Sequence, residues 1–142
     1  MRAARGVWQR DRMSSFLLNV NLDCANPYRL AEFWCEVVGR PMDPDLGPDD
    51  EETWVEMPSP PNLYFQRVPE PKVVKNRVHV CLVPDVPRED EVERLVGLGA
   101  SVVGDHRTDD GRGWVVLGDP EGNEFCVLRS NAERAAIGDP TV

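Results

Sequence analysis

Histidine and cysteine are the scarce reactive residues of this 142-residue chain, which has two histidines and four cysteines. His79 lies in the alternating segment RVHVCLV, and His106 lies in the polar loop DHRTDDGRG. An imidazole can transfer a proton, form hydrogen bonds or bind a metal ion near neutral pH. His79 could therefore contact a ligand, or it could only satisfy a neighbouring amide such as Asn19 or Gln66. His106 and its arginine neighbours could contact an anionic substrate, or the loop could simply be solvated.

The cysteines are scattered along the chain, at Cys24, Cys35, Cys81 and Cys126, and no two form a C-x-x-C pair. This spacing indicates neither a zinc knuckle nor a redox motif, so we expect reduced thiols. We interpret Cys126 as a small buried residue. The alternative, a nucleophile, is less favoured because no sequence neighbour would lower the pKa of its thiol.

Aromatic residues offer surfaces on which a planar ligand could stack. Trp54 and Trp114 are candidates for this role, and the simpler alternative is that both belong to the core. Tyr64 lies two residues before Gln66 on an alternating segment, so the two side chains should share one face. Its hydroxyl group would then be available to a ligand.

The aromatic residues also reveal an internal repeat with an offset of sixty residues. Like residues recur in the pairs Trp54 and Trp114, Pro60 and Pro120, Phe65 and Phe125, and Val20 and Val80. Each copy predicts an alternating strand, a helix and three short strands. The expected strands are 16–23, 40–43, 53–57 and 63–68 in the first copy, and 77–83, 101–105, 113–117 and 124–128 in the second.

Local signals mark the two expected helices. In the first copy, Asn26 is a plausible N-cap, Pro27 occupies the first helical position and Gly39 ends the helix. The second helix should begin near Pro87 and end at Gly99.

The repeat resembles the vicinal oxygen chelate superfamily, which includes glyoxalase I, bleomycin-resistance proteins and extradiol dioxygenases. The most specific segments are ANPYRLAEFWCEVVGRP, KNRVHVCLV, LGASVV and WVVLGDPEGNEFCVL, and they are most similar to the glyoxalase-like domain group. The resemblance implies an α+β fold in which two tandem βαβββ modules form a half-open mixed β-barrel with helices on the convex face. We expect a flexible arm at 1–13, a domain at 14–130 with modules at 14–70 and 75–130, and a C-terminal tail at 131–142.

The resemblance also implies where a site would lie. Metal-dependent relatives carry ligands on the first and last strand of each module, and the matching positions here are Asn19, Gln66, His79 and Cys126. Because no carboxylate stands at these positions, we expect neither a divalent metal nor another cofactor, and the base for glyoxalase-type proton abstraction is missing. The predicted ligand pocket consists of the cavity-facing residues Asn19, Asn21, Tyr64, Gln66, His79, Cys126, Trp54 and Trp114.

The net charge of the chain limits the kinds of partner that it can bind. With 25 acidic and 16 basic residues, the chain has a net charge of −9, which repels nucleic acids and anionic lipids. No apolar run approaches the roughly 20 residues that cross a bilayer, so we expect a cytoplasmic protein without nucleic-acid or membrane partners. Translation would start at Met1 or Met13.

These observations predict a glyoxalase-like protein with a small-molecule pocket and without the usual metal site. One alternative is a non-catalytic binder that sequesters a drug or toxin, since the negative charge suits a cationic ligand. A metal-dependent lyase or isomerase of the glyoxalase type is the other. The strand edges of a half-barrel would also allow a homodimer.

Overall fold

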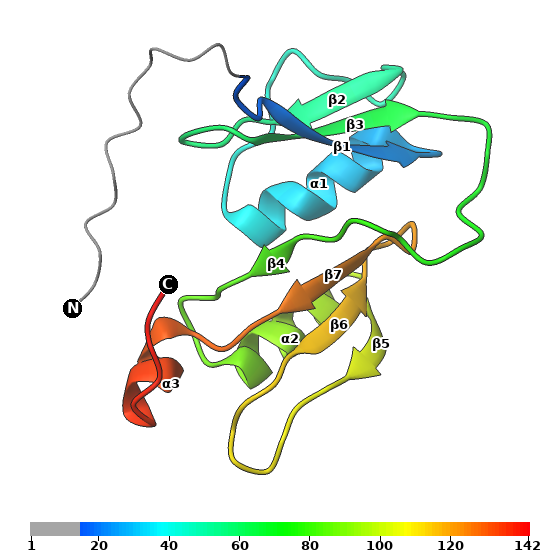
Figure 1. The fold of residues 1–142 in the computed structure, drawn as a ribbon. Coiled ribbons are helices and arrows are strands. Elements are labelled where there is room, and N and C mark those ends of the chain that lie inside the picture. The colour runs from blue at the N-terminus through cyan, green and yellow to red at the C-terminus, as the bar shows by residue number, and fades with distance from the viewer. Residues whose placement is uncertain (1–14) are drawn as a thin grey trace.

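The computed structural model describes residues 15–142, and the arm predicted at 1–13 lies outside the described residues. Figure 1 shows an α+β fold with two separate sheets. The strand order is β1-β3-β2 in the first sheet and β4-β7-β6-β5 in the second. Among the described residues, no helix has the length and hydropathy needed to cross a membrane.

The first half of the chain forms a three-stranded sheet and one helix. Its elements are β1 (Asn19–Cys24), α1 (Pro27–Val38), β2 (Glu52–Val55) and β3 (Asn62–Arg67). The predicted ends of the helix are confirmed: the Asn26 side chain accepts a hydrogen bond from the Arg29 N–H at 3.1 Å, and Pro27 begins the helix. Gly39 ends it with a φ of 66°, in the left-handed region that glycine adopts most easily.

The second half has one more strand and a further helix. Its elements are β4 (Cys81–Leu82), α2 (Arg88–Gly97), β5 (Ser101–Asp105), β6 (Val115–Gly118), β7 (Glu124–Val127) and α3 (Asn131–Ala136). The last helix lies in the segment that we expected to be a tail. It begins with a capping box, in which Ser130 and Glu133 each accept a hydrogen bond from the other's backbone N–H.

The strand predicted at 40–43 is wrong, because this segment is irregular. Proline has no N–H to donate to a ladder, and Pro41 and Pro44 lie in and next to the segment. The Arg40 side chain instead donates from Nε to the Glu56 carbonyl oxygen at 3.0 Å. The first sheet therefore lacks a strand that the second sheet has, namely β5.

A cluster of aromatic side chains joins the two halves of the molecule. Helix α1 lies beneath the first sheet, on the side of the second half (Figure 1). From there, Trp34 reaches Phe125 of β7, with ring centroids 5.0 Å apart, and also contacts Phe33 edge-on at 5.7 Å. All three residues are buried, so this cluster holds α1 against the second sheet.

Polar contacts from the turn between β6 and β7 reinforce this junction. The Trp34 indole donates from Nε1 to Asp119 Oδ2 at 3.2 Å. Burial raises the pKa of the Asp119 carboxyl group, while hydrogen bonds from Asn123 and Trp34 oppose the rise. In the same turn, the Glu121 carboxylate accepts hydrogen bonds from the backbone N–H groups of Ala25 and Asn26, at 2.6 Å and 2.9 Å. A carboxylate of the second half thus lies at the positive N-terminus of α1 in the first half.

We predict that Glu121→Ala lowers the free energy of unfolding by about 1–2 kcal/mol, because two N–H groups at the helix start lose a charged acceptor. Urea unfolding followed by circular dichroism measures the change. The matched control is Glu93→Ala on the exposed face of α2, which should change stability by less than about 0.5 kcal/mol. Equal effects of the two substitutions would show that the contact across the junction contributes nothing.

Candidate functional site

The second sheet has a buried face and an open face. Val115, Leu117, Phe125 and Val127 alternate along β6 and β7, and all four are fully buried. The intervening side chains of the same strands point the other way. They line an open hollow of about 380 Å³ whose largely apolar wall includes Trp114, Val116 and Leu128.

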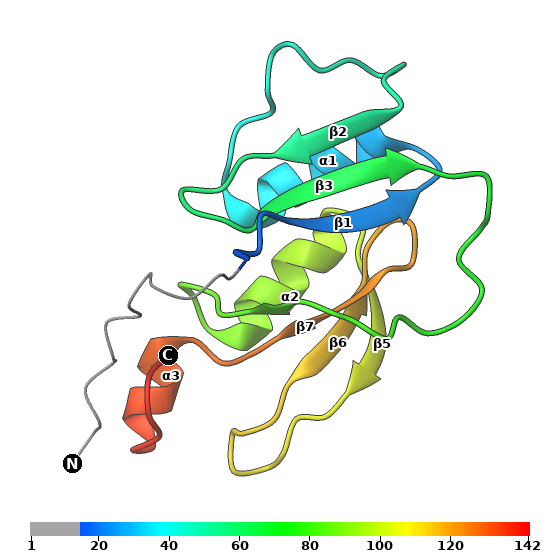
Figure 2. The ribbon, with the colours of Figure 1, turned by 45° about the horizontal axis from the view of Figure 1, so that its top comes forward.

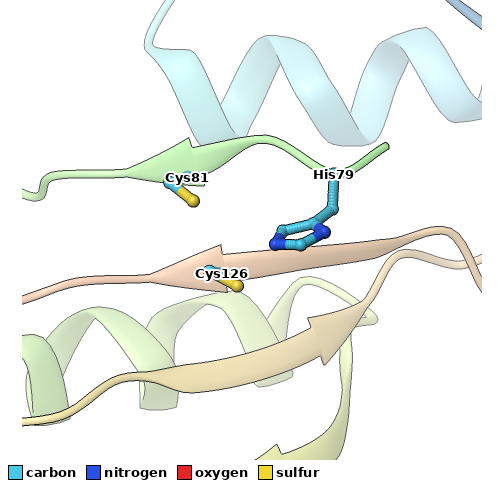
Figure 3. Close-up of side chains that lie close together, drawn as sticks. All are labelled: His79, Cys81 and Cys126. Atoms are coloured by element: carbon cyan, nitrogen blue, oxygen red, sulfur yellow. The ribbon is translucent and has the colours of Figure 1, made fainter. Parts of the chain in front are cut away.

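Three potential ligand side chains meet in this hollow, as Figure 3 shows. Cys81 and Cys126 are direct partners across the parallel pair of β4 and β7. His79 precedes Cys81 by two residues and therefore lies on the same face. The ligand atoms, an imidazole nitrogen and two Sγ atoms, all lie within 4.8 Å of one another. We call these three residues the His-Cys-Cys cluster.

The two thiols of the cluster differ in their environment. Cys81 is exposed, whereas Cys126 is buried. Burial raises the pKa of the Cys126 thiol to about 11, the adjacent Cys81 thiol contributes to the rise, and the charge of Lys75 opposes it. Cys126 is therefore protonated at neutral pH, which argues against its acting unaided as a nucleophile.

An exposed tryptophan forms the other side of the hollow. The Trp114 ring stacks on the His106 ring, with centroids 5.0 Å apart and an angle of 26° between the planes. Trp114 is 43% exposed, so the interpretation of this residue as core is wrong. On the first sheet its repeat partner, Trp54, stacks on Tyr64 at 5.7 Å and 17°. Each sheet therefore presents an aromatic stack at the repeated position.

The pairing of the strands changes which residue of β1 corresponds to His79 in the second half. Gln66 pairs with Asp23 in the first sheet, whereas Cys126 pairs with Cys81 in the second. Because Gln66 and Cys126 are sixty residues apart, the structural counterpart of Cys81 is Asp23. The first strands of the two copies are therefore fifty-eight residues apart in the sequence, whereas the last strands are sixty residues apart.

With this register, His79 corresponds to Asn21 rather than to Asn19. The Asn21 side chain donates from Nδ2 to Gln66 Oε1 at 3.4 Å. Asn21 and His79 both line a second opening, a groove of about 740 Å³ between β1 and residues 70–80. Figure 2 shows the two sheets, with β1 at the edge of the first sheet nearest the second half of the chain. Asn19 is not among the residues that line the groove or the hollow. The structure therefore brings together two pairs of residues from the predicted pocket, Asn21 with Gln66 and His79 with Cys126, and Asn21 stands where Asn19 was expected.

These two pairs do not fit the divalent metal centre that the resemblance implies. The amides of Asn21 and Gln66 are neutral and hydrogen-bonded to each other. Hard divalent ions prefer several oxygen ligands, usually including carboxylates. Within residues 15–142, no carboxylate groups with His79 at metal-ligand distance.

Residues 19–128 of the chain match the model of the glyoxalase-like domain family. The chain belongs to this family. It therefore also belongs to the vicinal oxygen chelate superfamily, as the sequence resemblance indicated. No curated protein matches the chain.

Solved structures of glyoxalase-like proteins share the fold. A glyoxalase/bleomycin resistance protein/dioxygenase family enzyme from Burkholderia phytofirmans PsJN is 16% identical, with a TM-score of 0.60 over 80% of this chain and 97% of that one. A glyoxalase-related enzyme from Fulvimarina pelagi is 16% identical, with a TM-score of 0.61 over 81% and 88%. A lactoylglutathione lyase from Agrobacterium tumefaciens is 18% identical, with a TM-score of 0.55 over 81% and 93%. At these identities the similarity shows the fold alone.

We predict that the two thiols of the cluster react at different rates with iodoacetamide in reduced, chelator-treated protein. The exposed Cys81 should be alkylated first, and Cys126 should react slowly at pH 8, with a rate that rises with pH until about pH 11. Peptide mapping by mass spectrometry measures both rates. Equal rates at pH 8 would contradict the burial of Cys126.

Proposed function

We propose that the chain binds a small organic molecule in the hollow of the second sheet, without the divalent metal centre of the glyoxalase enzymes. The observation that carries this proposal is the exposed Trp114, which borders the hollow and stacks on His106. An aromatic face beside Val116 and Leu128 suits a planar apolar ligand, and the polar groups of His79 and Lys75 could fix its orientation. We infer that the two halves of the chain form the two modules of a half-open barrel. The hollow would then lie on the concave face of this barrel.

The arrangement of carboxylates supports binding rather than glyoxalase chemistry. Proton abstraction beside a carbonyl needs a free base. Glu124, which lines the groove with His79, accepts hydrogen bonds from the Asn76 N–H and from Lys72 Nζ, each at 3.0 Å. Burial would raise the pKa of Glu124, but these contacts outweigh it and lower the pKa. A carboxylate held in this way is a weak base, so we do not propose a lyase or isomerase.

We predict that the intrinsic tryptophan fluorescence of the protein changes saturably during titration with planar aromatic probes, namely a panel of naphthols and naphthoquinones. Trp114→Ala should weaken binding about tenfold or more, because the stacking surface is lost. Trp54→Phe is the matched control and should leave the affinity unchanged. Saturable binding that persists unchanged in Trp114→Ala would contradict the site, and the absence of binding across the panel would contradict the function.

A second candidate function, the sequestration of a cationic drug or toxin, is favoured by the aromatic stack on the first sheet. Glu52 precedes Trp54 by two residues on β2 and lies opposite Gln66 of β3. Burial, the charge of Glu52 and a hydrogen bond to Glu52 together raise the pKa of the Tyr64 hydroxyl. A carboxylate beside two stacked rings attracts a cation, and the net charge of −9 acts in the same direction.

For this second candidate we predict that a cationic aromatic dye such as ethidium binds with an affinity that falls as salt is added. Trp54→Ala and Glu52→Gln should each weaken binding about threefold to fivefold, while Trp114→Ala should not. Fluorescence anisotropy of the dye measures the affinity. Binding that is insensitive to salt and to both substitutions would reject the candidate.

A further inference from the structure

Cys81 belongs to the His-Cys-Cys cluster but to none of the four ligand positions that the family resemblance implies. The resemblance takes one donor from the first strand and one from the last strand of each module. Here, all three donors come from β4, the residues just before it, and β7. The cluster therefore shares His79 and Cys126 with the implied positions, but it adds Cys81 and takes all its donors from the second sheet and the residues just before it.

We propose that His79, Cys81 and Cys126 bind a thiophilic divalent ion of the zinc type at the edge of the hollow. Two sulfur donors and one imidazole nitrogen form a soft ligand set, which selects zinc over magnesium or calcium. Two thiolates would also neutralise the charge of a divalent ion. Zinc sites with two cysteines and one histidine keep a fourth position for water or a substrate atom.

The distances within the cluster suit a tetrahedral ion. Zinc binds sulfur at about 2.3 Å and imidazole nitrogen at about 2.0 Å, which brings the donors of a tetrahedral site to about 3.4–3.8 Å from one another. In the structure, all three donor atoms lie within 4.8 Å of one another before any ion is considered. The remaining difference is at most about 1.4 Å, which small rotations of exposed side chains can cover, and both His79 and Cys81 are exposed.

The residues around the His-Cys-Cys cluster leave its donor atoms free to bind an ion. Within residues 15–142, no side chain or backbone group forms a hydrogen bond with the His79 imidazole, so it does not satisfy Asn19 or Gln66. Lys75 lines the same hollow. His106 also lines the hollow, but it is occupied in the stack on Trp114 and is not part of the cluster. A fourth coordination position would therefore face the open hollow.

The test uses the full chain, reduced and stripped of metal with a chelator, and titrated with cobalt(II) as a spectroscopic substitute for zinc. We expect one equivalent of cobalt to produce the visible bands of a tetrahedral site and a thiolate-to-cobalt charge-transfer band. Added zinc should then displace the cobalt, so that the visible bands and the charge-transfer band both disappear. A large excess of magnesium should leave both unchanged. Weak bands typical of octahedral coordination, without the charge-transfer band, would overturn the proposal.

Single substitutions test each of the three donors. Cys81→Ser, on an exposed residue that should not affect folding, and His79→Gln should each weaken binding by at least about 100-fold. Cys126→Ser should do the same, with circular dichroism confirming that it folds. The matched thiol control is Cys24→Ala, which removes a buried cysteine outside the cluster and should leave the spectrum unchanged.

Two further variants distinguish metal binding by the His-Cys-Cys cluster from metal binding at the superfamily positions and from binding of the aromatic probes. Asn21→Ala and Gln66→Ala together should leave cobalt binding unchanged, and a loss of binding would show instead that the four-position site is used. Trp114→Ala should weaken binding of the aromatic probes about tenfold or more but retain the metal. Binding of cobalt that is unaltered in Cys81→Ser would overturn the inference even if the probes bind as proposed.

Discussion

The parallel pairing of β4 with β7 determines which side chains share the open face of the second sheet. It places Cys81 opposite Cys126, and a shift of one residue would turn one of the two thiols into the core. Because β4 is only two residues long, neighbouring hydrogen bonds must hold this register. The Cys126 N–H donates to the Val80 carbonyl oxygen and the Leu128 N–H to that of Leu82, both at 2.9 Å. The properties that we assign to the hollow depend on these bonds.

The two halves follow a similar plan but present different chemistry. Where the second sheet has His79 and Cys126, the first sheet has Asn21 and Gln66, whose amides bond to each other. The aromatic stacks are retained on both sheets, at Trp54 and at Trp114. A repeated framework therefore carries a hollow that contains the His-Cys-Cys cluster on one sheet, and an aromatic stack beside Glu52 on the other. This agrees with the general rule that sites vary on a common fold.

Local signals in the sequence predicted those parts of the fold that depend on neighbouring residues. Asn26 and Gly39 bound the first helix because capping and left-handed φ values are local properties. The same kind of signal was overlooked twice. The prolines at 41 and 44 exclude a strand, and the S-x-x-E pattern at Ser130 and Glu133 begins the last helix.

The register of the strands could not be predicted in this way. Alternation has a period of two, so a shift by two residues leaves every side chain on its expected face. Alternation thus predicted that His79 faces the open side, but it could not distinguish Asn19 from Asn21 as the counterpart of His79. For the same reason it could not show that Cys81 meets Cys126, which only the hydrogen bonds between the strands determine.

Cross-linking of the two thiols tests this register most directly. In protein with Cys24→Ala and Cys35→Ala, dibromobimane can bridge only Cys81 and Cys126 among the cysteines of the chain. The structure predicts a fluorescent cross-link within one molecule, found by mass spectrometry between the peptides that contain these two residues. Two singly modified cysteines without a bridge, in protein that remains folded, would contradict the pairing of β4 with β7 on which the candidate site depends.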